Sequence, residues 1–202
     1  MLETVQSVSE ETAAAIAAAF AAYPYEEGEQ SQFRDFKNQE RVQAYIRQYI
    51  LHNAAASGRL YTWKDRGYVY VTDEHTQFSF RQSLGMLKLL VRTGGWHVFW
   101  KEFFSDLEPG QETLLRQHKK PYYHVEMVAV LPEYQKQGVL KRLLGEVEDW
   151  ARRDGCRVIL ETDNRAKAQM YEHLGYELKG RRFRPPGLCW YDLCRDFTGQ
   201  AG

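Results

Sequence analysis

Three polar side chains in this chain have the types and the spacing that proton transfer requires. His124 and Glu126 lie two residues apart in the alternating run 122–131, so in a strand both side chains point to the same face. Either group can accept a proton, and a carboxylate flanked by apolar residues on an inner strand is expected to have a raised pKa, as a general base needs. Tyr171 lies in a helical pattern, and its phenol can protonate a basic leaving group.

The strand pattern also sorts the neighbours of His124 and Glu126 into two faces. Continued alternation places Tyr122, Val128 and Val130 on their face, and the opposite face carries Tyr123, Val125, Met127, Ala129 and Leu131. Structural roles are the alternatives. Glu126 is equally suited to pair with an Arg or Lys or to cap a loop, and Tyr171 has the helical spacing from Leu174 that is typical of a core tyrosine.

A candidate anion-binding turn follows the same strand. Gln135, Gln137 and Gly138 separate the strand from an amphipathic helix that begins at Val139. Unpaired backbone N–H groups meet there at the positive end of the helix dipole, so the turn is suited to bind phosphate. A single glycine between a strand and a helix is also typical of a plain turn.

Two blocks of residues together resemble the signatures of the GNAT (Gcn5-related) N-acetyltransferases. Gln135-x-x-Gly138 resembles the acetyl-CoA signature Gln/Arg-x-x-Gly-x-Gly/Ala, with Leu140 in place of the last Gly or Ala. Asn164, Tyr171 seven residues later, and Leu174-Gly175-Tyr176 resemble the second signature. The segment 190–195, with Leu160-Glu161-Thr162, is similar to the puromycin N-acetyltransferase branch, so the resemblance covers roughly residues 120–195.

The resemblance implies an α/β (mixed α+β) protein with the GNAT fold, a single domain over residues 1–202. Its centre would be a mixed, mostly antiparallel sheet with helices on both faces. The strand 122–131, the helix that ends at Gly155 and the strand 157–162 form one strand-helix-strand unit, which requires a parallel pair joined right-handedly. A helical insertion over about 77–118 precedes the fourth strand, and the acetyl-CoA-binding core is expected at about 120–182.

Acetyl-CoA is the co-substrate that the resemblance implies, and no metal is expected. The pantetheine arm would run along the strand at 127–130, and the pyrophosphate would lie on the amides of 135–140. The implied cofactor-binding residues are Met127, Val128, Val130, Gln135, Lys136, Gln137, Gly138, Val139, Leu140, Lys141, Asn164 and Tyr171. Asn164 is also suited to cap the helix that follows it.

The implied reaction is direct transfer of an acetyl group from acetyl-CoA to a primary amine. Glu126 or His124, directly or through water, would deprotonate the amine, and Tyr171 would protonate the CoA thiolate. Cys156 is rejected as a nucleophile, because it lies in an apolar strand without a nearby His in sequence. The acceptor is predicted to be a small-molecule amine. The alternatives are a protein N-terminal or lysine acetyltransferase, which needs an open groove, and a non-catalytic acyl-CoA-binding or sensing module, which Leu140 favours.

The remaining helices and strands are predicted from hydrophobic periodicity and from residues that cap helices or form turns. Helices are predicted from Ser9, a suitable N-cap, to Ala22 and over about 39–56, and Lys64-Asp65-Arg66-Gly67 joins two hairpin strands. Within the insertion, helices are predicted at 81–92 and from 110 to 118. The aromatic residues between them are expected either to form a pocket wall for an aromatic or cationic amine or to pack the insertion on the sheet: Trp96, Phe99, Trp100, Phe103 and Phe104.

Composition limits the partners and the compartment. The chain has 27 Lys and Arg against 27 Asp and Glu among 202 residues, so no general attraction to nucleic acid is expected. The N-terminus lacks the pattern of a signal peptide and no apolar run has membrane-spanning length, so the prediction is a cytoplasmic protein that does not bind membranes.

Three cysteines, Cys156, Cys189 and Cys194, are expected to be reduced. The protein is predicted to be a monomer or a homodimer.

Overall fold

A seven-stranded sheet forms the centre of the computed structural model, which describes residues 1–21, 24–77, 80–96, 98, 109–184 and 187–199. The strands are β1 (Glu3–Val5), β2 (Leu60–Thr62), β3 (Gly67–Asp73), β4 (Tyr122–Val130), β5 (Arg157–Thr162), β6 (Glu177–Arg184) and β7 (Leu188–Asp196). They lie in the order β1-β2-β3-β4-β5-β7-β6, and every pair is antiparallel except β4 and β5. The predicted mixed, mostly antiparallel sheet with one parallel unit is confirmed.

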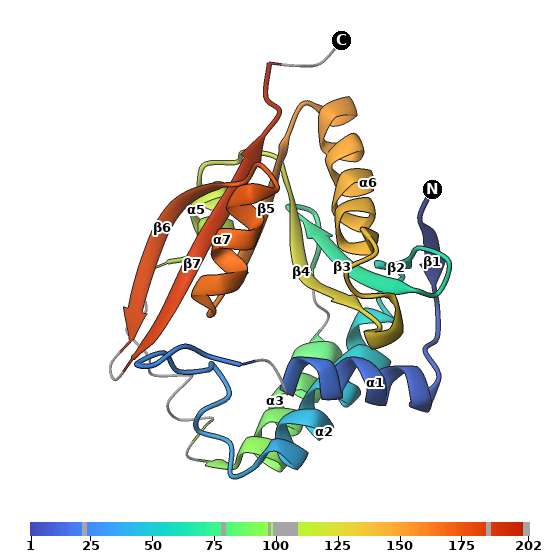
Figure 1. The fold of residues 1–202 in the computed structure, drawn as a ribbon, viewed down its shortest axis with the longest axis vertical. Helices are drawn as coiled ribbons and strands as arrows, with labels where there is room; N and C mark the ends of the chain where they lie inside the picture. The colour runs from blue at the N-terminus through green and yellow to red at the C-terminus, as the bar shows by residue number, and fades with distance from the viewer. Residues whose placement is uncertain (22–23, 78–79, 97, 99–108, 185–186, 200–202) are drawn as a thin grey trace.

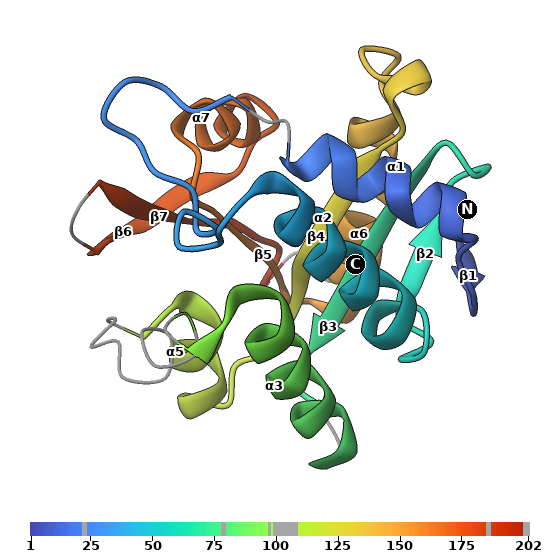
Figure 2. The ribbon, with the colours of Figure 1, turned by 90° about the horizontal axis from the view of Figure 1, so that it is seen from below.

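Helices cover both faces of this sheet (Figures 1 and 2). On one face, α1 (Glu10–Ala21) and α2 (Gln39–Tyr49) bury Ile16, Ile46 and Tyr70 in one apolar cluster. On the other face, α6 (Val139–Asp154) and α7 (Arg165–His173) pack on a second cluster that includes Leu143 and Val158. The sheet therefore separates two hydrophobic cores.

The predicted starts of the helices are supported by their caps. The N–H of Thr12 donates to Ser9 Oγ at 3.0 Å before α1, and the N–H of Arg41 donates to Asn38 Oδ1 at 3.0 Å before α2. The predicted helix over 39–56 differs in its last part, because the chain leaves the α-helix at Tyr49 and continues as a π-helix over Ile50–Ala54. Strand β1 was missed, since three residues are too few for an alternating pattern.

The insertion before β4 contributes α3 (Phe80–Gly94) and α5 (Gln111–Gln117). Helix α3 packs beside α2, and α5 places Leu115 against a small cluster that includes Tyr122 of β4. Both predicted helices of the insertion are therefore present. Of the aromatic residues between them, Trp96 is 64% exposed, while Phe99, Trp100, Phe103 and Phe104 lie outside the described residues.

A β-bulge interrupts β4 at Glu126. Tyr70 and Val71 are neighbours on β3, but they lie opposite Met127 and Val125, which leaves Glu126 without a partner on β3. The extra residue resets the alternation, because two residues of the bulged strand oppose one position of its neighbour. The predicted faces were therefore wrong beyond Glu126: Met127 and Ala129 lie in the same core as Tyr70, whereas Val128 and Val130 pack on the opposite core with Val125.

Strands β4 and β5 separate just before the bulge. They pair only over Tyr122–Val125 and Arg157–Leu160, although β4 continues to Val130 and β5 to Thr162. The backbone of β4 after Val125 therefore faces an opening between the two strands instead of a neighbouring strand. Among the helices of the described residues, none combines the length and the apolar character that a membrane crossing requires.

Candidate active site

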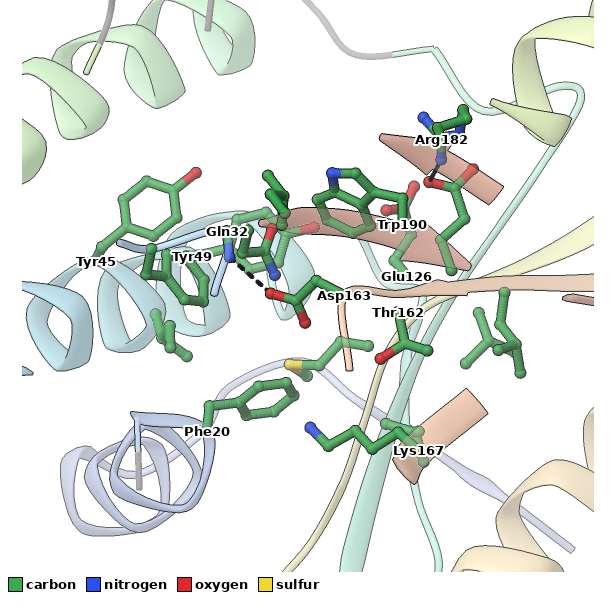
Figure 3. A pocket seen from close by; sticks show the side chains of 18 of the residues that line it. Phe20, Gln32, Tyr45, Tyr49, Glu126, Thr162, Asp163, Lys167, Arg182 and Trp190 are labelled. Carbon is green, nitrogen blue, oxygen red and sulfur yellow. Dashed lines mark hydrogen bonds and ion pairs between the residues drawn. The ribbon is translucent and has the colours of Figure 1, made fainter. Parts of the chain in front are cut away.

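A cleft of about 580 Å³ opens where β4 and β5 separate (Figure 3). The sheet contributes His124, Glu126 and Leu160, and α7 contributes Tyr171. The opposite wall comes from α1, α2 and the loop between them, and it is aromatic: Phe20, Tyr25, Phe33, Phe36, Tyr45 and Tyr49. The three residues predicted to transfer protons therefore line one cleft.

His124 lies at the base of the cleft between two carboxylates. Its Nδ1 atom is 3.3 Å from Oε2 of Glu112 and 3.4 Å from Oε1 of Glu126, and its side chain is only 8% exposed. Burial by itself would lower the pKa of the His124 imidazole, but the two neighbouring carboxylates more than offset this effect, and the pKa is raised. The neighbouring carboxylates therefore favour the protonated, positively charged form of the imidazole.

Glu112 is the residue of this cluster that sequence reasoning missed. It lies in α5, and its Oε1 atom accepts hydrogen bonds from Arg116 at 2.8 Å and from the hydroxyl of Tyr122 at 3.1 Å. The contact with His124 is the main cause that lowers the pKa of the Glu112 carboxyl to about 2, while burial opposes it. No local motif marks Glu112, because it meets His124 only through the packing of α5 on the sheet.

Glu126 is less enclosed than its apolar sequence neighbours indicate. The residue as a whole is exposed, its side chain keeps 25% of its accessible surface, and the hydroxyl of Thr72 donates to its Oε1 atom at 3.1 Å. The expectation of a carboxylate shielded on an inner strand was therefore wrong, because the bulge and the separation of the strands open this position to the cleft. The expectation that His124 and Glu126 point the same way is met.

Tyr171 is buried on α7 and packs edge to face against Tyr176, with ring centroids 6.1 Å apart. It also lines the cleft, so Tyr171 belongs both to the hydrophobic core and to the candidate site. Lys167, one turn earlier on α7, lies in the cleft as well, with Nζ 5.4 Å from the centroid of the Phe20 ring. Burial lowers the pKa of the Lys167 ammonium.

Asn164 has the capping role that its position before a helix predicts. Its Oδ1 atom accepts from the N–H of Lys167 at 2.9 Å, and its Nδ2 atom donates to the carbonyl of Pro24 at 3.0 Å. The residue is only 1% exposed. Asn164 thus joins α7 to the loop after α1, and its contact with the pantetheine arm stays a prediction.

The loop between α1 and α2 is tied to the end of β5 by Asp163. Its Oδ2 atom accepts from the N–H of Gln32 at 2.7 Å and from the hydroxyl of Tyr25 at 3.0 Å, as Figure 3 shows for Gln32. The N–H of Arg165 donates to Glu29 at 3.0 Å. These bonds hold the aromatic wall over the cleft, and sequence reasoning missed them because the partners are more than 130 residues apart.

Within the described residues, no side-chain hydrogen bond caps the helix that follows the predicted anion-binding turn. Gly138 adopts a left-handed conformation with φ 77°, no side chain caps α6, and the first backbone bond of the helix reaches the N–H of Arg142. The first turn carries Lys141 and Arg142 but no acid; α3 and α7 also begin without an acid, whereas α1, α2 and α5 begin with one. Cations are unfavourable at this end of a helix unless an anion binds there.

The other predicted residues of the turn are arranged around this start. The Nε2 atom of Gln135 donates to the carbonyl of Val130 at 3.3 Å, and that of Gln137 donates to the carbonyl of Glu133 at 2.8 Å. Lys136 is left-handed with φ 60°. Leu140 packs against the core beneath α6, together with the buried Val139.

Cys156 and Cys194 are not arranged for nucleophilic chemistry. Cys156 is 3% exposed and does not line the cleft. Burial raises the pKa of its thiol to about 11, and burial raises that of Cys194 to the same value. Both side chains therefore stay protonated at neutral pH and act as small apolar residues.

A mixed, mostly antiparallel sheet whose one parallel pair separates, with a cleft at the separation, is consistent with the GNAT fold. Residues 14–176 match the family model described as Acetyltransferase (GNAT) family. The chain therefore belongs to the GNAT acetyltransferase family, whose members transfer acetyl groups from acetyl-CoA to amines.

Curated relatives match over part of their length. N-alpha-acetyltransferase RimI of Mycobacterium tuberculosis is 35% identical over 77 residues, which cover 37% of this chain and 49% of the relative. An uncharacterized protein of Mycobacterium leprae, ML0378, is 38% identical over 68 residues, or 33% of this chain and 19% of that protein. The chain thus spans about half or less of the length of these curated relatives.

Solved structures match the whole fold at low identity. An N-acetyltransferase from Staphylococcus aureus Mu50 has a TM-score of 0.55 at 12% identity, with 96% of this chain and 100% of that chain covered. A polyamine N-acetyltransferase from Drosophila melanogaster has a TM-score of 0.51 at 14% identity, with 97% and 100% covered. These likenesses show the fold.

Proposed function

We propose that this protein transfers an acetyl group from acetyl-CoA directly to the primary amine of a small molecule with an apolar or aromatic body. The observation that carries the proposal is the cleft at the separation of β4 and β5, where Glu126 and Tyr171 share one space. Its volume of about 580 Å³ falls in the range of about 300–1,000 Å³ that is usual for small-molecule sites.

The cofactor would approach along β4 after Val125. The backbone of residues 126–130 faces the gap, so a pantetheine arm can pair with it as an added strand would. Its pyrophosphate would then reach the uncapped start of α6, where Gly138, Lys136 and Lys141 lie. Leu140 packs against the core, which leaves the amides of the turn available to the phosphates.

Glu126 is the proposed acceptor of the proton from the amine. Its side chain lines the cleft and keeps a quarter of its accessible surface, whereas His124 is buried and turns Nδ1 toward the two carboxylates. The amine nitrogen forms a bond to the acetyl carbonyl carbon, its proton passes to Glu126 directly or through water, and the carbon–sulfur bond breaks. Tyr171 donates its phenolic proton to the departing thiolate and regains one from water.

The aromatic wall supports the proposed class of acceptor. Phe33, Phe36 and Tyr45 pack on one another with centroids 5.6 to 6.1 Å apart, and all three line the cleft opposite the carboxylate. Such a wall attracts apolar and aromatic groups and contacts a cation through its ring faces. An acceptor with an amine at one end and an apolar body at the other matches both sides.

A peptide N-terminus is the second candidate acceptor, favoured by the similarity to RimI. A polypeptide requires a groove open at both ends, and the loop fastened to Asp163 contributes Tyr25, Gln32 and Phe33 to one wall of the cleft. The small-molecule acceptor is therefore the better match to the geometry.

The test is release of free thiol from acetyl-CoA across a panel of arylalkylamines, alkylamines, polyamines and short peptides. We expect the highest kcat/KM for apolar primary amines. Preference for peptides would contradict the proposed acceptor. Binding of acetyl-CoA without thiol release from any amine would instead identify a non-catalytic acyl-CoA-binding module.

A further inference from the structure

Glu112, His124 and Glu126 bring three metal-ligating side chains together at the base of the cleft. One donor atom from each residue lies within 4.8 Å of the others. The two distances from His124 Nδ1 to the carboxylate oxygens, 3.3 and 3.4 Å, are longer than the usual 2.9–3.0 Å of an N–H···O hydrogen bond. The three donor atoms therefore lie close together, while both contacts of Nδ1 are long for hydrogen bonds.

The buried nitrogen of His124 is a second, independent observation. Nδ1 is enclosed and makes no hydrogen bond of acceptable geometry among the described residues, and its nearest partners are the two carboxylate oxygens at 3.3 and 3.4 Å. A buried polar atom that lacks a well-formed hydrogen bond is costly, so a native protein normally satisfies it. An ion at the centre of the cluster would take the place of the imidazole proton and bind the nitrogen lone pair.

The two distances that involve His124 agree with tetrahedral coordination. Zinc binds imidazole nitrogen at about 2.0–2.1 Å and carboxylate oxygen at about 2.0–2.2 Å, so two donors at a tetrahedral angle are about 3.4 Å apart. Both distances from His124 Nδ1 match this value. Two ionised carboxylates also supply the negative charge that compensates a divalent cation.

The surroundings hold the two carboxylates in place. Arg116 and the hydroxyl of Tyr122 bond to Oε1 of Glu112, which leaves Oε2 directed at His124. The hydroxyl of Thr72 bonds to Oε1 of Glu126. Hydrogen bonds of this kind orient ligands around metal ions. His124 and Glu126 line the cleft, which supplies an entry path.

From these observations we infer that Glu112, His124 and Glu126 form a binding site for one divalent transition-metal ion of the Zn²⁺ class, with the fourth position open to water. The site goes beyond the acetyl transfer proposed above. A bound ion would occupy the carboxylate of Glu126, so the ion and the acceptor amine would exclude each other, and the metal would inhibit the enzyme. No sequence motif indicates the site, since Glu112 is 12 residues from His124 and lies on another element.

The experiment is calorimetric titration of the chelator-treated full chain with Zn²⁺, without acetyl-CoA or amine. We expect one ion per chain at micromolar affinity, and a rise in Tm on adding Zn²⁺. Glu112→Gln should weaken binding by more than about tenfold, because even the loss of an outer partner of a metal ligand costs about 10- to 100-fold. Glu126→Gln provides a second variant if Glu112→Gln does not fold, and Co²⁺ absorption reports the coordination geometry.

Two surface variants serve as matched controls. Glu133→Gln removes an exposed carboxylate at the other end of β4, and His118→Gln removes an exposed imidazole. Neither should change the affinity for Zn²⁺. The inference is overturned if the chain binds no stoichiometric Zn²⁺, or if Glu112→Gln and Glu126→Gln both bind as the unaltered chain does. Because the readout is binding, a protein that fails to acetylate amines still tests the site.

Discussion

Oε1 of Glu126 lies 3.4 Å from Nδ1 of His124, although Glu126 is the extra residue of a bulge that resets the rest of the strand. The bulge begins immediately after the last β4 residue that pairs with β5. One irregularity therefore opens the cleft, exposes the backbone of β4 and directs a carboxylate into the opening. Bulges next to active sites commonly re-aim a side chain in this way.

Replacement of this carboxylate tests its role as the base. Glu126→Gln should lower kcat/KM by about 10²- to 10⁴-fold, because a general base typically contributes that much and an amide cannot take the proton. Affinity for acetyl-CoA should change little, since the backbone of β4 is unaltered. Thiol release measures the rate, and Glu133→Gln, an exposed acid outside the cleft, is the control. A rate within twofold of the unaltered protein would contradict the assignment.

The phenol of Tyr171 is tested against its neighbour. Tyr171→Phe keeps the ring that packs on Tyr176 and removes only the hydroxyl, so we expect a folded protein with a kcat lower by about 10²-fold or more. Tyr176→Phe is the matched control, since that ring lies beside Tyr171 in the same core but does not line the cleft. If the two variants have equal rates, Tyr171 is a core residue and another group protonates the thiolate.

Much of this fold follows from local sequence signals. Hydrophobic periodicity and nearby capping or turn residues predict the helix that begins at Val139 and the parallel pair around it. They also predict the cap at Asn164. The pairing of His124 with Glu126 also follows, because two residues on one strand share a face.

The parts that could not be predicted depend on contacts between distant segments. The predicted faces are wrong after Glu126, because nothing in the residue types distinguishes a bulge from a regular strand. Glu112 reaches His124 only because α5 packs on the sheet, and Asp163 reaches Gln32 only because the loop crosses the end of β5. Strand β1 is defined by its pairing with β2, which a run of three residues does not indicate.

The basic start of α6 allows a test in which stability and binding change in opposite directions. Lys141 is exposed in the first turn, where a positive charge opposes the helix dipole. Lys141→Glu should stabilise the protein without ligand by about 0.3–1 kcal/mol and raise the KM for acetyl-CoA. Thermal unfolding and initial rates measure the two effects.

Lys88→Glu makes the same change of charge on α3, away from any helix end, and should leave KM as it is. A lower KM for Lys141→Glu would exclude phosphate binding at this turn.

Direct transfer predicts that no cysteine carries the acetyl group. Burial raises the pKa of the Cys156 thiol to about 11, so almost no thiolate is present at neutral pH. Cys156→Ala should retain activity, alkylating reagents should not inactivate the folded protein, and initial rates should follow a sequential pattern. Parallel lines in the double-reciprocal plots, together with a labelled acetyl-protein, would instead identify a covalent intermediate.

The aromatic wall predicts how the enzyme chooses its acceptor. Tyr45 lies on α2, packs on Phe33 and Phe36, and faces the cleft opposite Glu126 (Figure 3). Tyr45→Leu keeps an apolar side chain but removes the ring, and an aromatic pair contributes about 0.5–1.5 kcal/mol beyond its buried area. We therefore expect the KM for an arylalkylamine to rise by about 2- to 10-fold, since about 1.4 kcal/mol corresponds to a factor of ten. The KM for an alkylamine of similar size should change by less than about twofold, because its contact with the wall depends on apolar area alone. Tyr61→Leu, which removes a ring that packs on Trp150 outside the cleft, is the control and should shift neither value. An equal rise for both amines would mean that Tyr45 shapes the cleft without selecting aromatic acceptors.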